Sequence, residues 1–332
     1  MSRLVIGTRG SKLALAQTRW VADALRRVHP DLEIDIRSIQ TRGDATQAAN
    51  VPLASFGEKG IFAKELETAL LAGEIDLAVH SLKDMAHTLP DGLTIAAVPP
   101  REDPRDCLLG SALDALPPGA RVGTGSVRRR ALLLSRRPDL QMLEIRGNID
   151  TRLRKLQEGQ YDAICLAVAG LSRLGLQEHV AEIFDPDWFT PDPGQGALAL
   201  ETRDSHRIPN LVKAINDETA ELTTRAERAF LRAIGGSCKT PIGASATVGG
   251  NYGHYLWLDG MIAAPDGTTI LRKRTVEATV APQSEGLPVA DYLRSVVDAM
   301  TAPEILGQQV AAQLRAAGAE RLLGLEGGVA SE

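Results

Sequence analysis

The stretch RLVIGTRGSKLALAQTRWVADALRRVHP, residues 3–30, predicts a strand, a glycine turn and a helix in direct succession. The apolar run before Gly7 is typical of a buried strand, and the apolar residues that follow recur at helical spacing until Pro30. The alternation continues with strand patterns at 33–41 and 75–81 and a helical pattern at 62–73. This order indicates an α/β fold whose parallel strands are joined by crossovers.

Two proline-rich segments interrupt the alternation, VPPREDPRDCLLG at 98–110 and FDPDWFTPDPGQG at 184–196, and a strand pattern resumes directly after the second. We therefore expect the chain to leave one lobe, build a second and return. The fold predicted is α/β, with two hinged doubly wound lobes like those of periplasmic binding proteins and a smaller α+β C-terminal domain. The expected boundaries are 1–99 with 199–217 for lobe 1, 100–198 for lobe 2 and 218–332 for the third domain, and the cleft between the lobes is the expected ligand site.

Composition narrows the class of protein. The 332 residues carry a net charge of −5 and only three cysteines, with no CxxC pair. These features argue against a disulfide framework, structural zinc, or a nucleic acid or membrane partner. No run resembles an export signal or a membrane span, so we expect a cytoplasmic protein.

Three strand-to-helix turns carry glycine and a hydroxyl or amide residue together with arginine: 6–14, 122–130 and 145–153. Helix N-termini favour anions, because their N–H groups are unpaired and the helix dipole is positive there. The stretch 121–154 holds nine arginines and only three acidic residues. Such a set suggests a ligand with several carboxylates. The alternative is a solvated basic face, with Ser126 as an ordinary helix cap.

The segment IDLAVHSLKDMAHTLP, residues 75–90, ends a strand and then supplies Lys83 and Asp84. Ligands of open α/β sheets bind beyond the carboxyl ends of strands, so Asp84 is placed to act as a general acid or base. The alternative is an Asp in a surface turn. His80 and His87 lack the ligand pattern of a metal site, and we expect no metal.

RAIGGSCKTPIGASA, residues 232–246, places Cys238 in a glycine loop beside Lys239. Cys107 and Cys165 fall in or next to apolar strands and are expected to pack in the core. Cys238 has no such surroundings, and the neighbouring lysine favours its thiolate. We expect a reactive thiol that is used covalently.

Over nearly the whole chain, the motifs IGTRGSKLALAQ, DLAVHSLKD, GTGSVRRR, IRGNIDTRL, PGQGALALE and GGSCKTPIG occur in an order that resembles the porphobilinogen deaminases, also called hydroxymethylbilane synthases. The resemblance implies a transferase of tetrapyrrole biosynthesis that joins four porphobilinogen molecules into hydroxymethylbilane and releases ammonia. It also implies one covalent dipyrromethane cofactor per chain, attached through a thioether at Cys238, and Asp84 as the catalytic residue.

The same resemblance assigns the binding of substrate and cofactor to a set of arginines with polar supports. These are Arg9, Ser11, Lys83, Ser126, Arg128, Arg129, Arg146, Arg152, Arg173 and Gln195. The polar segment 49–62 could form a lid whose last residue, Phe62, stacks on a pyrrole ring. We expect the protein to act as a monomer.

Two other functions stay open from the residues alone. The two-lobed layout also suits a non-catalytic binding protein for a polycarboxylate, which would have no covalent group on Cys238. A transferase with a cysteine nucleophile and a phosphorylated substrate would carry only a transient adduct.

Overall fold

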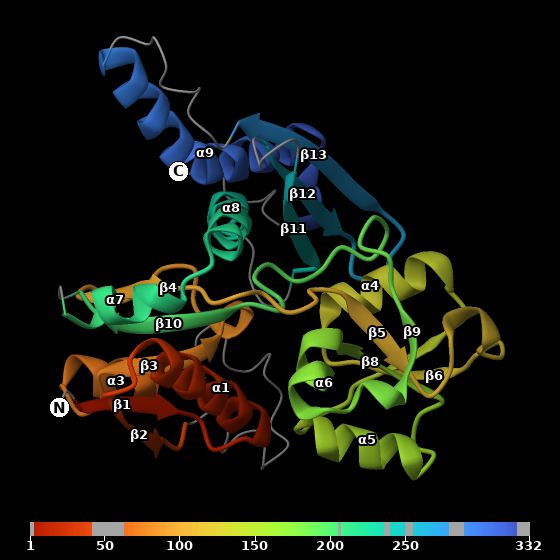
Figure 1. Cartoon of the computed structure of the whole chain (residues 1–332). Helices are drawn as coiled ribbons and strands as arrows, with labels where there is room; N and C mark the ends of the chain where they lie inside the picture. The colour runs from red at the N-terminus through yellow and green to blue at the C-terminus, as the bar shows by residue number, and fades with distance from the viewer. Residues whose placement is uncertain are drawn as a thin grey trace, which may run out of the picture.

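The computed structural model describes residues 3–41, 63–204, 207–235, 240–249, 255–278 and 289–323, with the backbone alone at 207, 278, 289–300 and 323. Two α/β lobes lie side by side, and a third sheet with its helices lies above them (Figure 1). The predicted class, two α/β lobes plus a smaller α+β part, is confirmed. The predicted domain boundaries themselves stay predictions.

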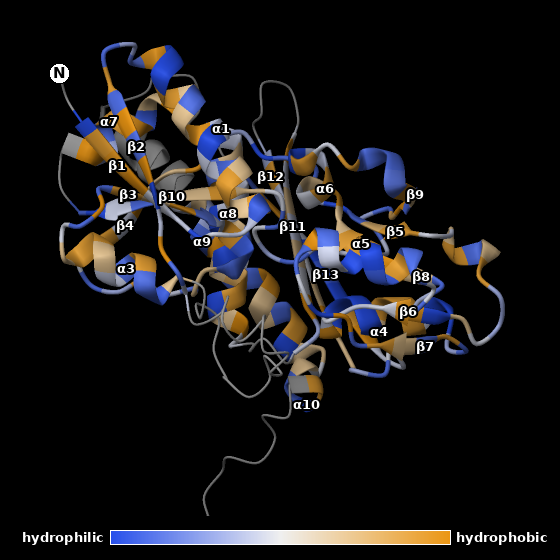
Figure 2. Ribbon diagram, turned by 90° about the horizontal axis from the view of Figure 1, so that it is seen from below, coloured by the Kyte–Doolittle hydropathy of each residue, from blue (hydrophilic) through white to orange (hydrophobic). Residues whose placement is uncertain are grey.

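Lobe 1 is a mixed five-stranded sheet with helices. Its strands, in order across the sheet, are β2 (Glu33–Ser38), β1 (Arg3–Thr8), β3 (Leu77–Ser81), β10 (Leu198–Arg203) and β4 (Leu93–Ala97). Its helices are α1 (Lys12–Val28), α3 (Lys64–Leu71), α7 (Arg207–Val212) and the short 3₁₀ turns η2 (Leu82–Asp84) and η5 (Lys213–Ile215). Hydrophobic residues dominate β1, β3 and β10, whereas α1 mixes both kinds (Figure 2).

Lobe 2 repeats the plan. Its strands, in order across the sheet, are β7 (Gln141–Leu143), β6 (Arg121–Gly123), β8 (Ala163–Ala167), β5 (Asp106–Leu109) and β9 (Val180–Ile183). Its helices are α4 (Val127–Arg136), α5 (Ile149–Gln157), α6 (Val168–Leu174) and the 3₁₀ turns η3 (Leu113–Ala115) and η4 (Gln177–His179).

The strands that the sequence predicts as parallel, β1–β3 in lobe 1 and β6–β8 in lobe 2, are parallel, but each lobe also contains one antiparallel strand. β10 runs antiparallel to β3 and β4, and β5 runs antiparallel to β8 and β9. The register explains why: Leu198 pairs with Ser81 at the end of β3, and Asp106 pairs with Ala167 at the end of β8. Each crossing segment therefore delivers the chain to the end of the sheet that faces the other lobe, and the next strand must run away from it.

The C-terminal region is an antiparallel sheet of β11 (Ile242–Gly249), β12 (Tyr255–Ala263) and β13 (Ile270–Ala278), packed against α8 (Glu218–Ile234), α9 (Val289–Ala316) and α10 (Ala319–Leu323). Phe230 of α8 is fully buried in its core. A Cβ at Gly307 of α9 would lie 2.5 Å from the backbone nitrogen of Phe230, so the two helices approach at a position that only glycine allows. None of the described helices is long and apolar enough to cross a membrane.

A buried carboxylate joins the three regions. Glu227 of α8 is fully buried and accepts two hydrogen bonds from Arg101 of the first crossing, at 2.8 and 2.9 Å. It also accepts the backbone N–H groups of Gly194, in the second crossing, and Ala246, in β11. Arg101 in turn donates to the carbonyl of Gln195. Both crossings are thereby fixed against the C-terminal region, and they pass directly beside the cleft.

Candidate active site

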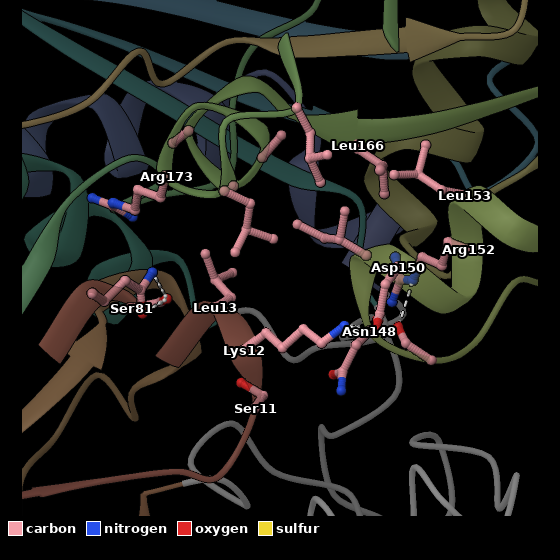
Figure 3. Close-up of a pocket in the computed structure, with 18 of the residues that line it drawn as sticks. Ser11, Lys12, Leu13, Ser81, Asn148, Asp150, Arg152, Leu153, Leu166 and Arg173 are labelled. Carbon is pink, nitrogen blue, oxygen red and sulfur yellow. Dashed lines mark hydrogen bonds and ion pairs between the residues drawn. The ribbon is translucent and has the colours of Figure 1, made fainter. Parts of the chain in front are cut away.

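A cavity of about 630 Å³ lies between the two lobes and is lined by residues of both (Figure 3). Eight of the predicted site residues line it: Arg9, Ser11, Lys83, Asp84, Arg129, Arg152, Arg173 and Gln195. They come from the start of α1, from η2, from α4, α5 and α6, and from the second crossing. Residues that lie far apart in the sequence are thus brought together where the sequence predicted a cleft.

Of the other five predicted residues, three lie elsewhere and two are outside the described residues. Ser126, Arg128 and Arg146 are described but do not line this cavity. Ser126 caps α4, where its Oγ accepts the N–H of Arg129, and Arg146 is ion-paired with Glu144. Phe62 and Cys238 lie outside the described residues. Their roles stay predictions.

The three arginine-bearing turns all begin helices, as the sequence predicts, but they contribute unequally to the cavity. Ser11 caps α1 by accepting the N–H of Ala14 at 3.2 Å, and Asn148 precedes α5. Both of these helix starts line the cavity, whereas α4 contributes only Arg129. The N–H groups and positive dipole ends of α1 and α5 therefore border the space between the lobes.

One buried acid near this space was missed by the sequence analysis. Asp106, at the start of β5, is fully buried, and its two oxygens lie 2.8 Å from Nη1 of Arg128 and 2.7 Å from Nη2 of Arg129. Gln195 donates to the same carboxylate at 2.9 Å. The acidic partner that the sequence analysis assigned to a bound anion is, for these two arginines, a residue of the protein. No sequence signal marks it, because Asp106 is one of several acids in a charged crossing segment.

The charge of Asp106 is firmly held. Burial alone would raise its pKa, but the positive charges of Arg128 and Arg129 outweigh burial and lower the pKa to about 2. Arg128 also donates to the carbonyl of Thr190, and Arg129 to that of Cys165. Arg129 is thus a cavity-lining cation that shares one acidic partner with Arg128.

Three other cations are not compensated in this way. Arg152 donates through Nε to the carbonyl of Gly147 at 2.8 Å, Arg173 donates to that of Gly196 at 2.6 Å, and Lys83 donates to the side-chain oxygen of Gln195 at 3.1 Å. All of these acceptors are neutral. In the part of the chain that the structure describes, none of the three cations has a carboxylate within ion-pair distance.

Burial makes these charges costly. It lowers the pKa of Arg173 to about 10 and, together with the charges of Arg129 and Arg146, that of Arg152 to about 10. The pKa of Lys83 is likewise lowered by burial and by Arg129, while Asp84 raises it. Among the described lining residues, seven are Arg or Lys and only two, Asp84 and Asp150, are acidic. An anionic ligand would relieve this imbalance.

Asp84 directly follows Lys83 in the sequence. It ends η2, directly after β3, and is half-buried at the cavity wall. The turn that follows it is held from the C-terminal region, because Arg228 of α8 donates to the carbonyls of Ala86 and His87 at 3.0 and 3.2 Å. Asp84 is therefore a carboxylate fixed on a supported turn in a cationic cleft, where it can exchange a proton or stabilise a developing cation.

The rest of the wall is apolar and includes Leu13, Leu166, Ala169 and Leu174. Apolar surface beside guanidinium groups such as those of Arg152 and Arg173, whose described partners are neutral, suits flat rings that carry several carboxylates. The fold and the site thus define a two-lobed α/β protein with a cleft for a polycarboxylate ligand.

Comparison with known proteins gives the family. Residues 4–208 match the profile described as "Porphobilinogen deaminase, dipyromethane cofactor binding domain", and residues 221–316 match "Porphobilinogen deaminase, C-terminal domain". A porphobilinogen deaminase of Roseiflexus sp. (strain RS-1) is 49% identical over 294 residues, which cover 87% of this chain and 95% of the relative. One of Thermus thermophilus is 47% identical over 320 residues, 95% and 100% of the two chains.

The chain belongs to the porphobilinogen deaminase family. It is a transferase of tetrapyrrole biosynthesis, and its two lobes match the family's dipyrromethane cofactor-binding domain. Among solved structures, the methionine-binding protein MetQ is similar with a TM-score of 0.41 at 13% identity, covering 66% of this chain and 92% of that one.

The described residues fit the cofactor that the family implies. Dipyrromethane carries an acetate and a propionate on each of its two pyrrole rings, and the cleft offers buried cations with neutral partners beside an apolar wall. Arg152 and Arg173 are the residues best placed to hold such carboxylates, because each uses only one guanidinium nitrogen in a hydrogen bond to the described part of the chain.

The buried charge of Asp106 gives the first prediction. Because the pKa is depressed in the folded state, the carboxylate contributes stability above about pH 4, the ordinary Asp value, and this contribution is lost as the pH falls toward about 2. Asp106→Asn should cost about 3–5 kcal/mol at neutral pH, since it leaves buried guanidinium groups without their counter-charge.

Urea unfolding between pH 7 and pH 3 measures both effects. The variant should lose less stability than the wild type as the pH falls, and Asp114→Asn, at an exposed site, should behave as the wild type does. Equal stability of wild type and Asp106→Asn at pH 7 would show that Asp106 does not hold the two arginines.

Proposed function

We propose that this protein joins four porphobilinogen molecules head to tail into hydroxymethylbilane, with release of one ammonia at each addition, on a dipyrromethane primer held by a thioether to Cys238. The observation that carries the proposal is a carboxylate, Asp84, set in a cleft whose partly buried cations have neutral partners among the described residues. Family membership supports the same reaction.

The cations bind and orient the substrate. Porphobilinogen carries one acetate and one propionate, and the guanidinium groups of Arg152 and Arg173 can each engage a carboxylate in two parallel hydrogen bonds. Lys83 adds a single positive charge between Gln195 and Asp84. Because these groups are partly shielded from water, each contact is stronger than it would be at the surface.

Asp84 acts on the reacting end of the substrate. Release of ammonia breaks the bond between the methylene carbon and the amino nitrogen, and the electron pair leaves with the protonated amine. The methylene-pyrrole that remains is cationic, and the carboxylate of Asp84 can stabilise this charge and hold the pyrrole N–H. The pyrrole carbon of the preceding ring then forms the new carbon–carbon bond and loses its proton.

When bound, dipyrromethane supplies the pyrrole carbon to which the first substrate is joined. The chain's own contribution is the anchor. Helix α8 ends at Gly235, which adopts a left-handed conformation with φ 75°, and Cys238 follows three residues later. The role of Cys238 rests on the sequence motif, as do those of Phe62, Ser126, Arg128 and Arg146. Action as a monomer in the cytoplasm, without nucleic acid, completes the proposal.

The other candidate, a non-catalytic binding protein for a polycarboxylate, is not favoured. It would explain the cations but gives no use to Asp84, and the curated relatives are named as enzymes. The following two predictions separate the reaction from mere binding.

A cofactor attached covalently at Cys238 predicts an increase in the intact mass of the protein. The intact, denatured protein should be heavier than its sequence by two linked pyrrole units, and Cys238→Ala should remove this excess because the thioether cannot form. Cys107→Ala is the matched control: Cys107 is fully buried, and burial raises the pKa of its thiol to about 12. An unmodified but fully active wild type would contradict the anchor.

If Asp84 is catalytic, its substitution should lower the rate of turnover while leaving substrate binding in place. Asp84→Asn keeps the size of the side chain but removes its charge, so porphobilinogen should still bind while the rate of ammonia release falls by about 10²–10⁴-fold. Calorimetry and a steady-state assay measure the two quantities. Asp91→Asn, exposed later in the same loop, is the control, and a rate for Asp84→Asn within a few-fold of wild type would exclude the assigned role.

A further inference from the structure

One ion pair spans the cleft. Nζ of Lys12, the first residue of α1, lies 3.1 Å from Oδ2 of Asp150, in the first turn of α5. Both residues line the cavity, one from each lobe, and the side chain of Lys12 extends toward Asp150 (Figure 3). The pair is open to water, with 76% of the Lys12 side chain and 48% of the Asp150 side chain exposed.

The two residues of the ion pair differ in the other interactions that stabilise their charges. Asp150 is a favourable charge at the start of α5, and its Oδ1 also accepts the N–H of Thr151 at 2.9 Å. Its hydrogen bond with Lys12, together with backbone hydrogen bonds, lowers the pKa of Asp150. Lys12 is a cation at the start of α1, which the helix dipole disfavours, and α1 has no acidic residue in its first turn. Lys12 thus has no acid on its own helix, whereas Asp150 keeps the dipole of α5 and the N–H of Thr151 when Lys12 leaves it.

The next residue keeps this end of α1 close to lobe 2. A Cβ built on Gly170 of α6 would lie 3.9 Å from Cδ2 of Leu13 and 3.0 Å from Cδ1 of Ile149. The apolar contact between α1 and α6 thus stands beside the ion pair. Because that contact remains, Lys12 can exchange its partner without leaving the wall of the cavity.

Breaking the ion pair between Lys12 and Asp150 costs little free energy. Exposed ion pairs contribute about 0–1 kcal/mol, so a carboxylate that a bound ligand brings to the same place can displace Asp150. Each added porphobilinogen brings two more carboxylates into the cleft, while the buried cations stay the same in number. On the proposed function, later rings need cations nearer to the opening than Arg152 and Arg173.

We propose that Lys12 binds a carboxylate of the growing pyrrole chain, and that the ammonium group of Lys12 stays ion-paired with Asp150 until that carboxylate arrives. The inference rests on the proposed function and adds one residue, Lys12, to its substrate-binding set. Asp150 is the acid that pairs with Lys12, and so links the two lobes, when no ligand fills the outer part of the cleft.

The test compares Lys12→Gln with Asp150→Asn in the cofactor-loaded, full-length protein. After a limiting amount of porphobilinogen and an acid quench, intact mass gives the fraction of protein that carries one, two, three or four added pyrrole units. Lys12→Gln should raise the fraction of partly extended forms about 5-fold over wild type, and Lys12→Arg should restore the wild-type distribution. Asp150→Asn should instead lower the fraction of partly extended forms. Equal effects of Lys12→Gln and Asp150→Asn, or no effect of Lys12→Gln, would overturn the inference.

A second readout does not depend on turnover. The acetylation rate of Lys12 by an amine reagent, measured by peptide mass against exposed Lys213, should rise in Asp150→Asn at rest and fall again when porphobilinogen is added. A Lys12 that stays equally reactive with and without porphobilinogen contradicts the exchange. A wild type that neither carries a pyrrole adduct nor extends it would refute the proposed function instead, so the two failures are distinguishable.

Discussion

The arrangement of the cleft depends on the ion pairs that the buried carboxylate of Asp106 forms with Arg128 and Arg129. Both arginines belong to α4, and the same carboxylate also accepts a hydrogen bond from Gln195 of the second crossing. Two guanidinium groups are costly to bury without a counter-charge, so α4, the start of β5 and the crossing are fixed relative to one another. Gln195 then holds Lys83 through its other side-chain atom. A structural ion cluster thereby positions a cation of the site.

The remaining cations of the cleft follow a different rule. Arg152 and Arg173 are oriented by backbone carbonyls of Gly147 and Gly196, which fix the direction of each guanidinium group without neutralising it. Their charge is left for a ligand. Arg129 has an acidic partner within the protein, whereas the described partners of Arg152 and Arg173 are neutral carbonyls, and this difference is the basis for proposing that Arg152 and Arg173 bind the carboxylates of a ligand.

Much of this organisation could be predicted from the sequence, and the reasons are local. The strand-to-helix turns at Gly7, Gly123 and Gly147 are short-range signals, and each begins a helix where expected. The reversed directions of β5 and β10 could not be predicted, because they depend on which end of each sheet the crossings reach.

The partner of an arginine could not be predicted either. Arg128 and Arg129 carry the same motif signal as Arg152, yet only the first two meet Asp106, which lies more than twenty residues earlier in the chain. The roles of Phe62 and Cys238 stay predictions from sequence, because both lie outside the described residues. A thiol in a glycine loop next to a lysine predicts a reactive cysteine, and its use as the cofactor anchor is what the family resemblance implies.

The central claim is that carboxylates of the bound pyrroles complete the charge of the cleft. A crystal structure of the cofactor-loaded protein tests it most directly. The account predicts pyrrole acetate or propionate oxygens about 2.7–3.2 Å from the guanidinium nitrogens of Arg152 and Arg173, with Asp106 still paired to Arg128 and Arg129. Pyrrole carboxylates directed into solvent, with Arg152 and Arg173 bonded only to the protein, would contradict it.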